Sequence, residues 1–126
     1  MMTRKRIYLV LLVLWAGFTL FLTSLPHPGI DLPFSFADKV AHFGFYGVMG
    51  FLCAMWRRES GSTKGSAATA GLLFVAIVGA VDEGHQHWIP GRSTDVFDWI
   101  ADMAGGGIGA LCSTILPLLL PFLLTE

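Results

Sequence analysis

Long apolar stretches alternate with short polar segments along the 126 residues of the chain. The apolar stretches cover about residues 7–25, 38–56, 67–88 and 95–116. Each is close to the roughly 20 apolar residues that a helix needs to cross a bilayer. Prolines between residues 26 and 33, and a polar Gly- and Ser-rich segment at 57–66, separate the first three stretches. The pattern predicts an all-α fold, a bundle of four transmembrane helices that forms one domain over residues 1–126.

Composition agrees with a membrane location. Hydrophobic residues make up 54% of the chain and charged residues 13%, and the mean hydropathy is +0.66. These values are too apolar for a soluble domain of this size, so membrane lipids are the expected surroundings and partners. The formal net charge of -1 provides no basic surface, and no nucleic-acid partner is expected. Cys53 and Cys112 lie in separate apolar stretches, where cysteine acts as a small hydrophobic residue.

Basic residues predict the orientation of the chain. Arg4, Lys5 and Arg6 precede the first stretch, which lacks a convincing cleavage pattern and is expected to be an uncleaved anchor. More basic residues lie in segment 57–66, which is expected to be a flexible loop. The positive-inside rule places both of these regions, and with them both termini, in the cytoplasm. Residues 26–35 would then form an extended external loop, and Ser35 is a candidate N-cap for the second helix.

Polar side chains recur at helical spacing near one end of the last three stretches. Residues three, four or seven apart share a helix face. In the predicted topology all three ends lie at the outer membrane boundary. A charge at mid-bilayer costs about 2.5–3.5 kcal/mol on insertion scales, so we expect these residues to converge in one functional cluster. Its members are Asp38, Lys39, His42 and Tyr46 of the second stretch, Asp82, Glu83 and Gln86 of the third, and Asp95, Asp98 and Asp102 of the fourth.

The cluster contains candidates for acid–base catalysis on a phosphate group. Histidine has the ordinary pKa closest to neutrality, so His42 is the expected general base or nucleophile. Asp82 or Glu83 could orient His42 and stabilise its protonated form, which makes these three the expected catalytic residues. Arg92, in the Pro-Gly turn after the third stretch, could clamp a phosphate, and Lys39 could add a point charge. The other expected substrate-binding residues are Tyr46, Gln86, Asp98 and Asp102.

Two other interpretations use the same side chains. Lys39 and Arg92 could simply neutralise the carboxylates in a buried polar plug that fixes the helix register. The cofactor is unknown, although a divalent metal is possible, because the cluster offers an imidazole and several carboxylate oxygens. No close ligand spacing requires a metal. The ligands would come from His42, Asp82, Glu83, Asp98 and Asp102.

Glycines gather on two of the predicted helices. Gly44, Gly47 and Gly50 recur at every third position, and a glycine-rich run covers residues 105–109. Small residues at helical spacing let two membrane helices approach closely. We therefore expect the glycines to serve helix packing. A phosphate-binding loop would need a preceding strand, which the pattern does not predict.

Three motifs occur in order along the chain: Asp38-Lys39-x-x-His42-Phe43-x-x-Tyr46, Asp82-Glu83-x-x-Gln86-x-x-x-Pro90-Gly91-Arg92, and Asp98-x-x-x-Asp102 followed by the glycine-rich run. Together they resemble the motifs of the VanZ-like family of small bacterial membrane proteins, which usually has Asn where Asp102 stands. The resemblance implies a multi-pass protein of the bacterial cytoplasmic membrane that acts in the cell envelope, and the founding member of the family is associated with teicoplanin resistance.

The cluster and the resemblance together lead to two functional hypotheses. The first is an enzyme that modifies or exchanges phosphate-linked lipid head groups on the outer side of the cytoplasmic membrane. The second is a protein without enzymatic activity that binds an envelope component, such as a cell-wall precursor or a glycopeptide antibiotic, and alters susceptibility. A proton-coupled transporter is less well supported, because the predicted polar residues gather at one end of the helices.

Overall fold

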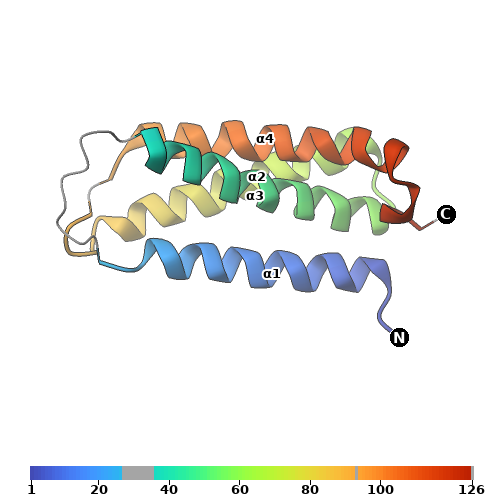
Figure 1. Cartoon of the computed structure of the whole chain (residues 1–126), viewed down its shortest axis with the longest axis horizontal. Helices are drawn as coiled ribbons and strands as arrows, with labels where there is room; N and C mark the ends of the chain where they lie inside the picture. Colours follow the sequence, from blue (N-terminus) through green and yellow to red (C-terminus); the bar gives the residue numbers. More distant parts are fainter. Residues whose placement is uncertain (27–35, 93, 126) are drawn as a thin grey trace.

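The computed structural model describes residues 1–26, 36–92 and 94–125. Its elements are α1 (Arg4–Thr23), α2 (Phe36–Glu59), α3 (Lys64–Gln86), α4 (Val96–Leu119) and a short 3₁₀ helix, η1 (Pro121–Leu123). The helices run along the long axis of the molecule, and both termini lie at the same end (Figure 1). No strand occurs in the described ranges, which confirms the all-helical prediction. Most of the predicted external loop, including Ser35, lies outside the described residues.

Helix α2 occupies the centre of the bundle. It packs against α1, α3 and α4, whereas α1 and α3 contact each other only slightly. Tyr46, Met49 and Met55 of α2 are completely buried. Apolar residues of the outer helices point away from the bundle instead, among them Val13, Ile77 and Leu118, which are 62%, 64% and 69% exposed. Such a surface suits contact with lipid.

Helices α1, α3 and α4 are long and apolar enough to cross a membrane, judged by length and composition. Helix α2 does not meet that criterion, although it has 24 residues. A helix of this length extends about 36 Å, which exceeds the hydrocarbon core of roughly 30 Å. The lower hydropathy of α2 has a structural reason, because α2 carries site residues and touches protein on several sides. That α2 crosses the membrane as well, as the fourth span of the bundle, therefore stays a prediction.

The connection between α2 and α3 is shorter than the sequence predicted. A flexible loop over 57–66 was the wrong prediction, since only residues 60–63 lie between the two helices. Arg57 and Arg58 extend the last turn of α2, where positive charge complements the helix dipole. Gly61 then reverses the chain with φ of 95°, and the Thr63 side chain caps α3 by accepting a hydrogen bond from the Ser66 backbone N–H.

Pro117 does not end α4, which continues to Leu119. A proline within a helix leaves the carbonyl four residues earlier without its N–H donor. Here the Arg58 guanidinium donates to that carbonyl, which belongs to Ser113. A side chain of α2 thus replaces the missing backbone donor and ties the two helices together.

Glycines form a close contact, here called the glycine seam, between α2 and α4. A Cβ added to Gly105 would clash with the backbone of Phe43, and one added to Gly109 would clash with the backbone of Gly47. Gly50 faces Gly106 in the same way. The predicted packing role is confirmed for these glycines but is wrong for Gly44, around which a Cβ would meet no atom within 4 Å. The seam fixes the distance between the helices that carry His42 and Asp102.

Helix α1 is attached to α2 mainly through an aromatic anchor. The Trp15 indole donates to the Phe45 carbonyl at 2.8 Å, and the two rings stack with centroids 5.2 Å apart. Tyr8 donates to the Leu123 carbonyl at 2.7 Å near the end where the termini lie. These contacts hold the other end of α1, with Thr19 and Thr23, beside the polar residues of α2.

Candidate functional site

The polar residues of α2, α3 and α4 come together at the end of the bundle opposite the termini. This end contains the first turns of α2 and α4 and the last turn of α3 (Figure 1). Asp82 and Asp102 are completely buried, and His42 is 6% exposed. Burial of so many ionisable groups is costly unless they are paired, so their partners define the site.

His42 is held by Asp102. The two side chains approach to 2.7 Å between Nδ1 and Oδ1. On the other side of the ring, Nε2 lies 3.9 Å from a carboxylate oxygen of Asp38 and 3.9 Å from one of Asp98. The sequence favoured Asp82 or Glu83 as the orienting carboxylate. The structure places Asp102 there instead, because the glycine seam draws α4 closest to α2.

Asp82 has a different set of partners. Its Oδ2 accepts a hydrogen bond from the Tyr46 hydroxyl at 2.9 Å, and its Oδ1 accepts one from Thr23 at 2.6 Å. The Tyr46 ring lies nearly parallel to the His42 ring, with an angle of 2° and 6.2 Å between centroids. Asp82 therefore positions Tyr46 beside His42 and does not contact the imidazole directly.

Sequence reasoning missed the contribution of α1. Thr23 bonds Asp82 and lies next to Thr19, which is 2% exposed. The signal was present, because two threonines four residues apart share a helix face. It was weak, since a threonine inside a membrane helix can satisfy its hydroxyl with its own backbone, as Thr19 does toward the Trp15 carbonyl.

Glu83 connects the end of α3 to the start of α4. Its Oε2 accepts a hydrogen bond from the Asp95 backbone N–H at 3.0 Å. Its other oxygen, the Gln86 amide nitrogen and the second oxygen of Asp102 are buried without a hydrogen-bond partner in the described part of the chain. Unpaired buried groups of this kind are uncommon and costly, which is a feature of sites under functional constraint.

Lys39 is already neutralised by two acids. Its Nζ lies 2.9 Å from Asp95 and 3.0 Å from Asp98. Asp95 caps α4 and also accepts a hydrogen bond from the Phe97 N–H. The hydrogen bond from Lys39, followed by that from Phe97, holds the pKa of Asp95 below its usual value. Two roles were expected for Lys39, to neutralise carboxylates or to bind a phosphate. Its pairing with Asp95 and Asp98 fits the first role better than the second.

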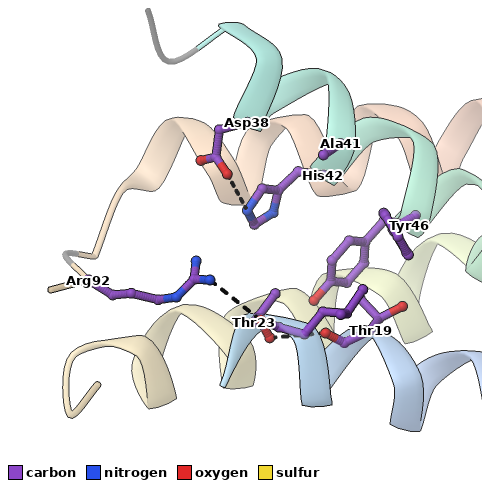
Figure 2. A pocket seen from close by; sticks show the side chains of 9 residues that line it. Thr19, Thr23, Asp38, Ala41, His42, Tyr46 and Arg92 are labelled. Carbon is purple, nitrogen blue, oxygen red and sulfur yellow. Dashed lines mark hydrogen bonds and ion pairs between the residues drawn. The ribbon is translucent and has the colours of Figure 1, made fainter. Parts of the chain in front are cut away.

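A pocket of about 180 Å³ opens beside His42, between α1, α2 and the connection of α3 to α4 (Figure 2). Of the nine predicted site residues, His42, Tyr46 and Arg92 line it. The other six, Lys39, Asp82, Glu83, Gln86, Asp98 and Asp102, do not line it. Among the described residues the lining consists of Thr19, Leu22, Thr23, Asp38, Ala41, His42, Phe45, Tyr46 and Arg92.

Arg92 reaches the pocket from a tight turn. Its backbone N–H donates to the Ile89 carbonyl at 3.1 Å, and Gly91 has φ of 77°. Pro90 followed by a glycine at positive φ suits such a turn, as the sequence predicted. The guanidinium donates to the Leu25 carbonyl at 2.8 Å and to the Leu22 carbonyl at 3.4 Å. Within the described residues it forms no ion pair with a carboxylate.

Two overlapping groups of side chains could hold a metal ion. One consists of Asp38, His42 and Asp98, and the other of His42, Glu83 and Asp102. Within each group the ligand atoms lie within 4.8 Å of one another. A histidine that binds a metal usually donates its second ring N–H to an acceptor, and Asp102 could accept it if Nε2 bound the ion. Asp82, which the sequence included among the ligands, belongs to neither group.

Comparison with known proteins identifies the family. A family model described as VanZ/LLP1 matches residues 4–117, which include all four α-helices except the last two residues of α4. A search of curated proteins and a search of solved structures each gave no match. Family membership and the three helices capable of spanning a bilayer indicate a membrane protein. The chain belongs to the VanZ/LLP1 family, as its three motifs suggested.

Proposed function

We propose that this protein is an integral membrane enzyme that modifies or exchanges phosphate-linked lipid head groups on the outer side of the bacterial cytoplasmic membrane. One observation carries the proposal. His42, backed by Asp102 at 2.7 Å, borders the same small pocket as the cationic Arg92. A base held by a carboxylate and an anchor for phosphate are the two parts that transfer of a phosphate-linked group needs.

The arrangement around His42 suits proton transfer. If Nδ1 carries its proton toward Asp102, Nε2 is left to accept a proton from an acceptor hydroxyl. The hydroxyl oxygen then attacks phosphorus, and the bond from phosphorus to the departing alcohol oxygen breaks. His42 returns the proton to that oxygen. Asp102 stabilises the imidazolium in between, and Tyr46, fixed by Asp82, supports the ring at a distance of 6.2 Å between centroids.

Charge distribution supports an outward-facing site. Helix α1 begins with Arg4, Lys5 and Arg6, and Arg57 and Arg58 lie in the last turn of α2, all at the end where the termini lie. Under the positive-inside rule this end is cytoplasmic. With α2 as the fourth span, the pocket at the opposite end would lie at the depth of the outer-leaflet phosphates. Arg92 would then meet the substrate's phosphate without a long excursion of the lipid.

The alternative is binding without any bond change, for instance of a cell-wall precursor or a glycopeptide antibiotic. The pocket lining supports this alternative, because Asp38 offers a hydrogen-bond acceptor and Arg92 offers donors to a ligand that is held without being changed. Catalysis converts many lipid molecules per protein, whereas binding saturates at the protein's copy number. The number of altered molecules per protein therefore separates the two functions.

The experiment is lipid mass spectrometry of envelopes from cells that express the unaltered chain, His42→Ala or His85→Ala at matched levels. His85 is an exposed histidine of α3 outside the pocket lining, so its variant is the control. We expect a head-group species that changes with the unaltered chain and with His85→Ala and stays unchanged with His42→Ala. Identical profiles for all three proteins would refute the proposed enzyme.

A further inference from the structure

The pocket carries opposite charges at two separate positions. Asp38 and Arg92 both line it, with the His42 ring between their levels in the view of Figure 2. The Asp38 side chain is 52% exposed, and its carboxylate comes no closer than 3.9 Å to His42 Nε2. The Arg92 guanidinium uses two of its N–H groups to donate to the carbonyls of Leu25 and Leu22, at 2.8 and 3.4 Å. A guanidinium has five N–H donors, so others stay available to a ligand.

Among the described residues around the pocket, acidic side chains outnumber basic ones. Lys39 compensates Asp95 and Asp98, and Asp102 is paired with His42. Asp38 has no comparable cation within hydrogen-bond distance among the described residues. A ligand with only negative charge would be attracted by Arg92 and repelled by Asp38. A ligand that carries both charges would satisfy both side chains.

We infer that the pocket selects zwitterionic head groups, in which a phosphate and a primary ammonium are joined by a short linker, as in phosphoethanolamine. This inference rests on the proposed function and names its substrate class. Arg92 receives the phosphate, Asp38 receives the ammonium, and His42 lies between them, next to the phosphate ester. The volume of about 180 Å³ suits a small head group better than a sugar chain or a peptide.

The remaining lining agrees with a lipid that enters from the membrane. Leu22, Ala41 and Phe45 provide an apolar side to the pocket, while Thr19 and Thr23 add hydroxyls. Phe45 belongs to the aromatic anchor that joins α1 to α2. The glycerol backbone and the first acyl carbons would contact these residues, and the charged head group would face His42.

The test uses the purified full-length chain in detergent micelles with equal amounts of dioleoyl phosphatidylethanolamine and dioleoyl phosphatidylglycerol. Native mass spectrometry counts each bound lipid. We expect the unaltered chain to favour phosphatidylethanolamine by about fivefold, the upper range for a partly exposed ion pair. Asp38→Asn should abolish the preference, and Asp38→Lys should reverse it. Glu59→Gln, which removes a carboxylate at the opposite end of the bundle, should leave it unchanged.

Soluble phosphoethanolamine provides a second arm. Its competition with the lipid would show that the head group alone suffices, whereas selectivity restricted to the lipid would add a contribution from the apolar side; both results support the inference. Equal binding of the two lipids by the unaltered chain, or a preference that survives Asp38→Asn, would overturn it.

Turnover is measured separately and distinguishes this inference from the proposed function. Selective binding of phosphatidylethanolamine with no change in its head group would keep the inference and refute the enzyme. Turnover of phosphatidylglycerol and phosphatidylethanolamine at the same rate would keep the enzyme and refute the inference.

Discussion

Gly105→Ala should damage both the stability of the bundle and the geometry of the site. Gly105 belongs to the glycine seam and faces the backbone of Phe43, the neighbour of His42 in α2. A Cβ at position 105 would lie 2.8 Å from the Phe43 carbonyl carbon and 2.9 Å from its Cα. Carbon atoms prefer a separation of about 3.5–4.0 Å, so α2 would have to retreat by roughly 0.7 Å or more.

The magnitude follows from three contributions. Overpacking against backbone costs about 1–3 kcal/mol, because backbone cannot rotate away as a side chain can. Retreat of α2 also stretches the 2.7 Å contact between His42 and Asp102, and loss of a hydrogen bond to a charged group costs about 1.5–3 kcal/mol. Replacement of glycine by alanine in a helix returns about 1 kcal/mol. We expect a net loss of roughly 1.5–5 kcal/mol in the free energy of unfolding.

Gly107→Ala is the matched control. It lies on the same helix and gains the same helix propensity, but its Cβ would meet only Leu72 Cδ1, at 3.6 Å. We expect it to be neutral or stabilising by up to about 1 kcal/mol. Both variants can be compared by unfolding in mixed detergent and SDS micelles, followed by circular dichroism. Equal stability of Gly105→Ala and Gly107→Ala would refute the close approach of α2 and α4 on which the site depends.

Two further predictions concern single contacts of the site. Tyr46→Phe should destabilise the protein by about 1–3 kcal/mol, because it leaves a buried oxygen of Asp82 without its donor; additivity with Asp82→Asn in a double-mutant cycle would contradict this coupling. Lys39 lowers the pKa of Asp95 in the folded protein. The ion pair therefore stabilises the fold at pH values above the ordinary aspartate pKa of about 4. This stabilisation is lost as the pH falls through the lower pKa that Asp95 has in the folded protein. Asp95 is 35% exposed on its side chain, which limits the effect to less than about 1 kcal/mol. Asp95→Asn preserves an N-cap residue and should flatten the part of a pH–stability profile that lies below about pH 4; an unchanged profile would show that the ion pair contributes nothing.

Local patterns determined much of the fold. The presence of the helices follows from the long apolar runs. That Asp82 and Glu83 lie near the end of α3 follows from their position shortly before the Pro-Gly turn. The turn itself was predictable, because proline presets one backbone angle and glycine permits φ of 77° at the next position. The family was also recognisable, since its motifs are short and lie in a fixed order.

Local spacing could not choose among the acids that surround His42. A spacing of three or four residues says which side chains share a face, but not how two helices rotate and slide against each other. The glycine seam sets that offset for α2 and α4, and it brings Asp102 rather than Asp82 to the imidazole. The same limit hid Thr23, whose hydroxyl has an ordinary local acceptor until α1 is packed beside Asp82.

The sequence by itself thus determined which residues are apolar enough to form a membrane bundle and at which helix ends the ionisable groups lie, because both properties depend on neighbours within a few turns. The tertiary structure alone decided the pairing of His42 with Asp102, the anchoring of Arg92 on the carbonyls of Leu22 and Leu25, and the pocket between them. These features join residues from separate helices, and they depend on contact distances that only the packed bundle defines.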